Sequence, residues 1–281
     1  MELNTVFSER DSFVALSLKD FSLLPPDGFC PPSTLCLGTF DGVHIAHREL
    51  FLQTVSLSRI PGEESIPCAF CFAFPPSDYL SDQPPAHLSD LRQKLLFMKQ
   101  AGIQRAYIAD FPSIKALSPS SFIEDVLQKQ LHCVRVVCGY NFRFGANGEG
   151  SPELLTRYFH QNAHILEPKK LDGSPVSSSS IREMIRRGDL REATRFLGHD
   201  FSFFSSWGTI SGCYYFLVPK DFATPPDGSY SVRISCRGED LCLIGTMASE
   251  GAQKILVFPP ENTALLQNLL KDSEAEISFN Y

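Results

Sequence analysis

Four short apolar runs, separated by longer stretches with helical periodicity, constrain the fold of this chain more than any other feature. The apolar runs are rich in β-forming residues and bounded by turn signals; they are Thr34–Gly38, Cys68–Phe74, Gln104–Ala109 and Cys133–Cys138. The helix-period stretches between them are His44–Ser58, Leu91–Gly102 and Pro119–Leu131. Strands that alternate with helices in this way predict an α/β fold, in which helices cover both faces of a parallel sheet.

Two further helices are expected after this region. Ser180-Ile181-Arg182-Glu183 matches the pattern of a capping box, and Gly188 is placed to end the helix that it opens. Asp189 then opens a second helix, which Gly198 ends.

Beyond about residue 200 the character of the chain changes. Short β-rich runs are separated by turns that contain proline and glycine; they are Gly208–Ser211, Tyr230–Cys236, Leu241–Thr246, Lys254–Phe258 and Ile277–Tyr281. Asn262–Leu270 alone is expected to be helical there. We therefore predict two domains, an α/β domain over residues 1–200 and a small, mainly-β, barrel-like domain over residues 201–281.

Charge and hydropathy exclude several classes of protein. The formal net charge is −7, which leaves no general basic surface, so we expect no nucleic-acid partner. No apolar run reaches the roughly 18 residues of a membrane-spanning helix, and Met1–Leu18 does not resemble a secretory signal. The nine cysteines lie mostly in apolar runs, which indicates buried thiols in a reducing cytoplasm. We expect a cytoplasmic protein, with its oligomeric state left open.

Cys68 and Cys71 have the C-x-x-C spacing of zinc and redox sites. They lie in a run that reads as a buried strand, where residues three apart face opposite sides. No second C-x-x-C completes a four-ligand set. We therefore interpret both cysteines as core residues.

A candidate phosphate site follows the first predicted strand, in the segment Gly38–His47. Ligands of open α/β sheets bind where the strands end and helices begin, and helix N-termini attract anions. Gly38 and Gly42 would let backbone amides approach a ligand. His44 and His47 are three apart and should share one face of the helix. The alternative interpretation is a turn with two surface histidines; a metal site is not expected, because the H-E-x-x-H spacing is absent.

Two more segments carry candidate binding residues. Ser177–Arg182 offers hydroxyls, helix amides and a guanidinium for a second phosphate cradle, although for this segment taken alone a helix cap with spare serines is the better interpretation. Gly139–Gly145 follows the Cys133–Cys138 strand and should lie at the same sheet edge. The chain contains no G-x-G-x-x-G, no P-loop and no G-x-S-x-G motif.

These segments together resemble the adenylyltransferase domain of the bacterial bifunctional riboflavin kinase/FAD synthetase family. That family's ordered motifs look like G-x-F-D-G-x-H-x-G-H, T-F-x-P-H-P, L-S-x-x-x-F, G-x-[DN]-F-R-F-G and S-S-T-x-I-R. Here they stand as Gly38–His47, Cys71–Pro76, Leu117–Phe122, Gly139–Gly145 and Ser177–Arg182. The resemblance covers about residues 15–200 and implies a Rossmann-like nucleotidyltransferase with a parallel sheet.

The resemblance implies transfer of AMP from ATP to FMN, giving FAD and pyrophosphate, with Mg²⁺ on the phosphates. By motif position, four residues are expected to be catalytic: His44, His47, Asn141 and Arg182. Ten are expected to bind the substrates: Gly38, Phe40, Asp41, Gly42, Phe142, Arg143, Gly145, Ser177, Ser178 and Ser179. No protein-bound metal is expected.

Three motif positions depart from the family pattern. Ala46 replaces a glycine between the histidines, Ser179 replaces a threonine, and Cys71–Pro76 lacks the histidine of P-H-P. Two alternatives therefore stay open: a non-catalytic flavin or nucleotide binder, and a nucleotidyltransferase for another phosphorylated acceptor. The tail also lacks the family's G-R-x-x-G-x-P-T-x-N kinase segment, so it resembles a shortened kinase barrel without riboflavin kinase activity.

Overall fold

The computed structural model describes residues 14–18, 31–270 and 274–280 of the chain. Two sequence-based expectations reach beyond these ranges. The segment Met1–Leu18, which was not expected to be a secretory signal, is described only from Val14, and the expected strand Ile277–Tyr281 is described only up to residue 280. The described residues fall into two compact units. The first comprises the chain up to Pro85 together with Leu91–Pro175, and the second comprises Ala86–Asp90 together with the chain from Val176 onward.

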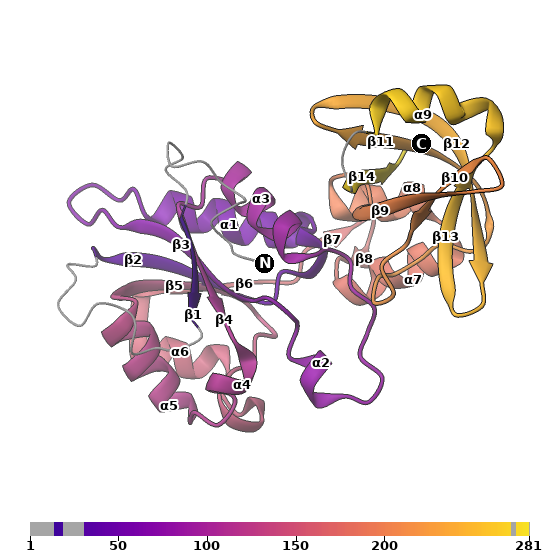
Figure 1. Ribbon diagram of the computed structural model, residues 1–281. Coiled ribbons are helices and arrows are strands. Elements are labelled where there is room, and N and C mark those ends of the chain that lie inside the picture. Colours follow the sequence, from indigo (N-terminus) through magenta and orange to yellow (C-terminus); the bar gives the residue numbers. More distant parts are fainter. Residues whose placement is uncertain (1–13, 19–30, 271–273, 281) are drawn as a thin grey trace. The chain divides into compact units, whose positions relative to one another are not determined.

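A parallel sheet forms the centre of the first unit (Figure 1). Six of the described strands build it, and every neighbouring pair is parallel. In spatial order they are β1 (Val14–Leu18), β4 (Arg105–Ala109), β3 (Ile66–Phe72), β2 (Ser33–Leu37), β5 (Cys133–Gly139) and β6 (Ala163–Leu166). The predicted α/β fold is thus confirmed, with β2, β3, β4 and β5 at the four apolar runs; β1 and β6, at the edges, were not predicted.

Helices cover both faces of this sheet (Figure 1). On one face, α1 (Ile45–Leu57) and α3 (Leu91–Gln100) bury Phe51, Leu95 and Met98 in one hydrophobic core. The helices of the opposite face contribute residues such as Leu127 and Leu155 to a second core; they are α5 (Pro119–Ser121), the π-helix η4 (Phe122–Gln130) and α6 (Pro152–Phe159). Shorter elements of this unit are α2 (Ser77–Leu80), α4 (Phe111–Ile114), η5 (Ala146–Gly148), η6 (His160–Asn162), β7 (Lys170–Leu171) and β8 (Ser174–Pro175).

The C-x-x-C pair shows the alternation of strand β3 directly. Cys68 belongs to one hydrophobic core and Cys71 to the other, so the two sulfurs lie on opposite faces of the sheet. Both are free and buried. The prediction that they are core residues rather than a zinc or redox pair is confirmed in its geometry.

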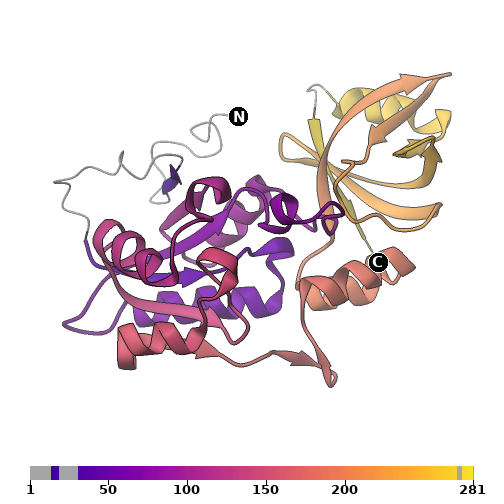
Figure 2. The same cartoon turned by 90° about the horizontal axis from the view of Figure 1, so that it is seen from below.

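A closed antiparallel barrel forms most of the second unit, and its strands curve round on themselves in Figure 2. The strand order is β10 (Cys213–Leu217), β13 (Gln253–Phe258), β12 (Glu239–Glu250), β11 (Gly228–Cys236), β14 (Glu274–Phe279) and β9 (Ser202–Ile210). The chain also forms η7 (Pro260–Asn262) and α9 (Thr263–Leu269) here, close to the predicted helix. The barrel-like prediction is confirmed, while β10 was not predicted.

Helices α7 (Ser178–Arg187) and α8 (Leu190–Leu197) belong to the same compact unit as the barrel. The short segment Ala86–Asp90 also joins it, because the His87 amide donates to the Asp221 carbonyl at 2.6 Å and the Ala223 amide donates to the His87 carbonyl at 2.9 Å. The compact units therefore divide at Pro175, not near residue 200. The domain extents 1–200 and 201–281, drawn from the change to short β-rich runs, stay a prediction.

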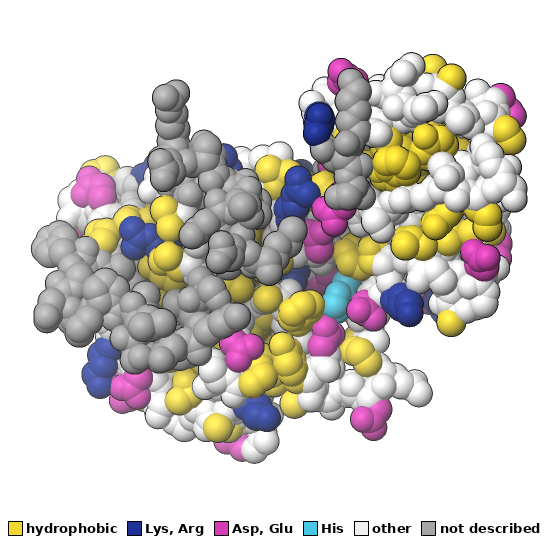
Figure 3. Space-filling model, viewed as in Figure 1, with side chains coloured by type: hydrophobic (Ala, Val, Ile, Leu, Met, Phe, Trp, Pro, Cys, Tyr) yellow, Lys and Arg dark blue, Asp and Glu magenta, His cyan; other side chains and the backbone are white. Residues whose placement is uncertain are grey.

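Charged side chains of both signs are scattered over the face drawn in Figure 3, where Lys and Arg do not gather into one basic patch. Within the described ranges, no helix has the length and apolar character needed to cross a membrane.

Candidate active site

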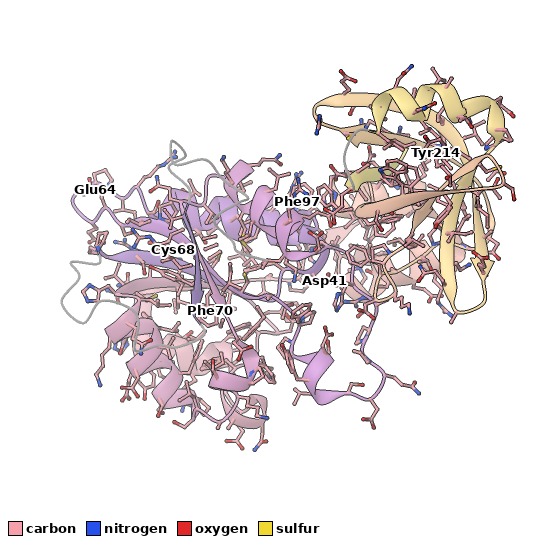
Figure 4. All side chains as sticks on the ribbon, in the orientation of Figure 1. Asp41, Glu64, Cys68, Phe70, Phe97 and Tyr214 are labelled. Atoms are coloured by element: carbon pink, nitrogen blue, oxygen red, sulfur yellow. The ribbon has the colours of Figure 1, made fainter. Side chains whose placement is uncertain are left out.

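All six strands of the sheet are parallel, so the loops that follow them meet at one edge. Figure 4 labels one residue at each end of the sheet: Asp41, in the loop after β2, and Glu64, just before β3. The predicted segments Gly38–His47 and Gly139–Gly145 follow β2 and β5, which are neighbours in the sheet. The fold thus brings these two segments to the same edge, as predicted from the sequence.

The loop after β2 is folded tightly against the sheet. A Cβ on Gly38 would lie 2.7 Å from Cε1 of Phe40, so only glycine lets the Phe40 ring fold back over the strand end. Phe40 has a left-handed backbone (φ 51°), is fully buried, and contacts Phe51 of α1 with ring centroids 4.8 Å apart. Gly42, at φ 77°, makes the next turn within η3 (Asp41–Val43). Asp41 is also buried.

His44 forms the N-cap of α1. Its backbone is extended, and its Nδ1 accepts a hydrogen bond from the His47 amide at 3.3 Å. Because Nδ1 is the acceptor, the proton of the neutral ring is on Nε2. The ring of His47 stacks on that of His44, with centroids 3.6 Å apart and 14° between the planes. The prediction that the two histidines share one face of the first turn is confirmed.

His47 is held as a neutral imidazole by its surroundings. Burial lowers its pKa well below the ordinary 6.5, and the repulsion that a second proton on the neighbouring His44 ring would meet, together with the Lys94 charge, lowers it further. The Phe40 ring meets the imidazole edge-on, at 5.4 Å between centroids. Within the described residues its Nδ1 is buried and has no hydrogen-bond partner. Two close, uncharged imidazoles beside a helix N-terminus are suited to donate hydrogen bonds to an anion without carrying full positive charges.

Lys94 is a residue of this region that motif reasoning missed. It lies on α3, which packs against η3, and only 1% of it is exposed. Its charge acts on both His47 and Cys71, at the end of β3. A signal was present in the sequence: Leu91, Lys94 and Leu95 share one helix face, so a lysine stands within the apolar stripe.

The segment after β5 combines a buried anchor with exposed polar groups. Phe144 is buried and contacts Phe122, with ring centroids 5.4 Å apart. Gly145 has φ 71°, and a Cβ there would lie 2.8 Å from the backbone nitrogen of Pro119. These contacts join two predicted motifs, Leu117–Phe122 and Gly139–Gly145.

The anchor leaves other side chains of this segment free to face solvent. Asn141 and Arg143 are exposed, and Phe142 is half-buried with its ring stacked on Phe144 at 5.7 Å. The segment therefore presents an amide, a guanidinium and an aromatic ring on a rigid turn.

Ser177–Arg182 lies in the second unit, at the start of α7. The predicted capping box over Ser180–Glu183 is wrong. Ser177 is the N-cap: its hydroxyl accepts from the Ser180 amide at 3.1 Å, and the Ser180 hydroxyl accepts from the Ser177 amide at 3.2 Å. The helix starts three residues earlier because serine hydroxyls can satisfy both amides, and a glutamate is not required. Gly188 (φ 82°) ends α7, as predicted.

The hydrogen bonds of the cap determine which hydroxyl groups of this segment remain available to bind a ligand. The Ser177 hydroxyl is used within the cap, whereas Ser178 is half-buried and Ser179 is exposed. Arg182 donates from Nε to the Ala86 carbonyl at 2.5 Å, a contact inside the second unit. Arg182 thus has a structural contact besides its predicted role.

The described residues contain no group of three or more His, Cys, Asp or Glu side chains that could hold a metal ion. The protein groups described at this edge are backbone amides, two imidazoles and the polar groups after β5.

Comparison with known proteins shows the family to which this chain belongs. The FAD synthetase family model matches residues 30–180, more than half of the chain. This chain belongs to the FAD synthetase family. The match covers the His44–His47 turn, Asn141–Gly145 and the first residues of α7, and thus includes the main motifs named from the sequence.

Curated relatives carry a double name. A bifunctional riboflavin kinase/FMN adenylyltransferase of Listeria monocytogenes is 28% identical over 221 residues, covering 73% of this chain and 68% of that protein. The Escherichia coli K12 protein of the same name is 29% identical over 192 residues, covering 66% of this chain and 59% of its own length.

A solved structure shares the fold of this FAD synthetase family member. It is that of a protein from Streptococcus pneumoniae named as a macrolide-efflux protein, and it matches with a TM-score of 0.79. The match covers 95% of this chain and 89% of that chain at 20% identity, which shows likeness of fold.

Proposed function

We propose that this FAD synthetase family member transfers the adenylyl group of ATP to FMN, giving FAD and pyrophosphate. The observation that carries the proposal is the stacked pair of His44 and His47 at the N-terminus of α1, within the matched family region. Neutral imidazoles and helix amides at the carboxyl edge of a parallel sheet suit a bound triphosphate.

In this reaction a phosphate oxygen of FMN attacks the α-phosphorus of ATP in line. The bond from the α-phosphorus to the bridging oxygen breaks, and pyrophosphate leaves with the electron pair. No covalent enzyme intermediate is needed, so positioning and charge stabilisation supply the rate. We assign His44 and His47 to the triphosphate, as donors to oxygens on which negative charge increases.

The remaining predicted site residues are assigned to shaping the histidine loop or to contacting the substrates. Gly38, Phe40, Asp41 and Gly42 shape the loop that presents the two histidines. Asn141, Phe142 and Arg143, which precede the turn at Gly145, are proposed to contact nucleotide or flavin; the exposed side chains of Asn141 and Arg143 support this. In the second unit, Ser178, Ser179 and Arg182 are proposed phosphate contacts, while Ser177 acts through the helix cap.

Mg²⁺ is proposed to arrive with the ATP phosphates, because such a cation usually keeps water and phosphate ligands rather than a protein cage. ATP and FMN are the proposed partners, and a cytoplasmic location stays a prediction. The oligomeric state stays open.

We further propose that this chain lacks riboflavin kinase activity, although its curated relatives carry both names. The barrel strands β9 and β10 pair Ile210 with Cys213, so only Ser211 and Gly212 connect them. These two residues have φ values of 51° and 81°, which suit a tight hairpin. A two-residue turn between β9 and β10 is too short to contain the G-R-x-x-G-x-P-T-x-N segment that the kinase domain of the family carries between its first strands.

The decisive experiment incubates the purified chain with FMN, ATP and Mg²⁺ and separates the flavins by chromatography. FAD that accumulates in step with pyrophosphate supports the proposal. Binding of ATP or FMN without FAD would instead favour a non-catalytic binder, as Ala46 and the missing P-H-P histidine suggest. A parallel reaction with riboflavin and ATP tests the kinase, and formation of FMN there would refute its proposed absence.

A further inference from the structure

Lys94 is a buried cation on α3, the helix that packs against the loop of the proposed phosphate site. It is 1% exposed, and it belongs to the buried face of α3 that packs against η3 and the core below α1. The other buried residues of α3 are Gln93, Leu95 and Met98, and of these Leu95 and Met98 belong to the hydrophobic core. A lysine in such a stripe is unusual, because a buried ammonium loses the water that would otherwise solvate it.

The position of Lys94 on α3 determines which side chains its positive charge affects. From α3, it acts on the His47 imidazole and on Cys71, near the end of β3. Both residues lie at the carboxyl edge of the sheet, where the N-terminus of α1 begins. A positive charge behind a helix N-terminus adds to its attraction for anions, and the effect is large where protein rather than water separates the charges.

We propose that Lys94 is a positioning residue of the phosphate site, whose buried ammonium acts on the His47 ring and on bound phosphate from the protein side. It adds to the burial that disfavours a charge on His47, and it supplies a positive charge that the neutral ring lacks. It needs no contact with the substrate, since its charge acts through the packed loop. This inference rests on the proposed function, because it assumes that phosphate binds at this edge.

A purely structural lysine is the alternative. Its four-carbon stem could simply fill space in the α3 stripe, as methionine would. The two roles differ in what Lys94→Met changes: a space-filling role is nearly preserved by methionine, whereas the electrostatic role is lost. Lys94→Arg keeps the positive charge but changes the shape of the side chain, so it should preserve an electrostatic role and disturb a space-filling one.

The test measures binding of pyrophosphate and of Mg·ATP by calorimetry in the full chain, beside the wild type, Lys94→Met and Lys94→Arg. Lys99→Met, in the last turn of the same helix, is the matched control for loss of a lysine charge. We expect Lys94→Met to weaken binding of both probes by on the order of tenfold. Lys94→Arg should retain most of the affinity, and Lys99→Met should match the wild type.

A second measurement reads the charge directly through the His47 imidazole in NMR titrations, assigned with His47→Asn. The titratable groups of this turn are His44 and His47, with Lys94 facing them from α3 and Asp41 buried in the preceding loop. Removing the Lys94 charge should shift the His47 titration upward, which a space-filling role would not do.

The inference is overturned if Lys94→Met binds pyrophosphate like the wild type, or if the His47 titration does not move. If Lys94→Met does not fold, Lys94→Arg decides: a folded arginine variant with lost binding would contradict the electrostatic role. FAD formation by the wild type is scored separately. A chain that binds pyrophosphate through Lys94 but forms no FAD would refute the proposed function alone.

Discussion

The ring of His47 lies flat on the ring of His44, with 3.6 Å between centroids, while the His47 amide donates to Nδ1 of His44. One residue therefore both caps α1 and takes part in the proposed phosphate contact. The two roles of His44 can be separated, because a substitution that keeps a capping side chain removes only the imidazole.

His44→Asn should keep the fold and lose the activity. Asparagine is among the best N-cap residues, so its side chain can replace Nδ1 as the acceptor for the first turn of α1. The imidazole donor is removed, and FAD formation should fall by roughly 10²–10³-fold, the range seen for loss of one charge-stabilising donor. Flavin chromatography gives the rate and thermal unfolding the stability.

Two comparison variants complete this test. His44→Ala removes the cap as well and should lose about 1 kcal/mol of stability besides the activity. His132→Asn, at an exposed histidine, should change neither. Full activity in His44→Asn would contradict the proposed role of the imidazole.

Acid should destabilise the protein through His47. Burial, and then repulsion from a second proton on the His44 ring and from the Lys94 charge, lower the pKa of the folded state well below 6.5. The unfolded chain therefore binds a proton on this ring at a higher pH than the folded chain does. Stability from this source is present above 6.5 and is lost as the pH falls towards the folded pKa.

The measurement is the melting temperature between about pH 7 and pH 5. His47→Asn should show a smaller fall than the wild type over this window. Burial, with the charge of Arg135, also lowers the pKa of His164, so His164→Asn should remove a separate part of the fall. An unchanged acid profile in His47→Asn would show that this ring titrates normally in the folded state.

Ser177→Ala should weaken α7 rather than abolish ligand binding directly. The Ser177 hydroxyl is the acceptor for the Ser180 amide at 3.1 Å, and loss of such a cap costs about 1 kcal/mol. Hydrogen exchange of the α7 amides reports the local loss. Ser179→Ala, at an exposed serine of the same turn, is the control and should leave exchange unchanged; equal protection in both variants would argue against the Ser177 cap.

Native thiol labelling should separate the cysteines by burial. Cys242 is exposed and should react first, whereas Cys68 and Cys71 are buried and should need denaturant. Burial raises the pKa of Cys71 to about 11, although the charge of Lys94 opposes this, so little thiolate is present near neutral pH. Mass spectrometry of labelled peptides gives the order. If Cys71 were labelled as fast as Cys242, or if labelling released zinc, Cys68 and Cys71 would have to be interpreted as a zinc or redox site.

Strand and helix periodicity predicted the central sheet because its strands are buried on both sides. The run around Cys68 and Cys71 is apolar at nearly every position, and its residues divide between two cores. Edge strand β6 (Ala163–Leu166) is only half-buried, so its sequence carries a weaker pattern and it was not predicted. The same holds for β10, whose exposed and buried positions alternate over only five residues.

The sequence by itself determined the α/β and barrel folds, the His44–His47 turn and the family, because periodicity and ordered motifs are local properties of a chain. Only the tertiary structure decided that Ser177 rather than Ser180 caps α7, since several neighbouring serines could each serve. It alone placed α7 in the same compact unit as the barrel and Lys94 close enough to His47 for its charge to act on that ring. Those relationships depend on which faces pack against each other, and packing joins residues that lie far apart in the chain.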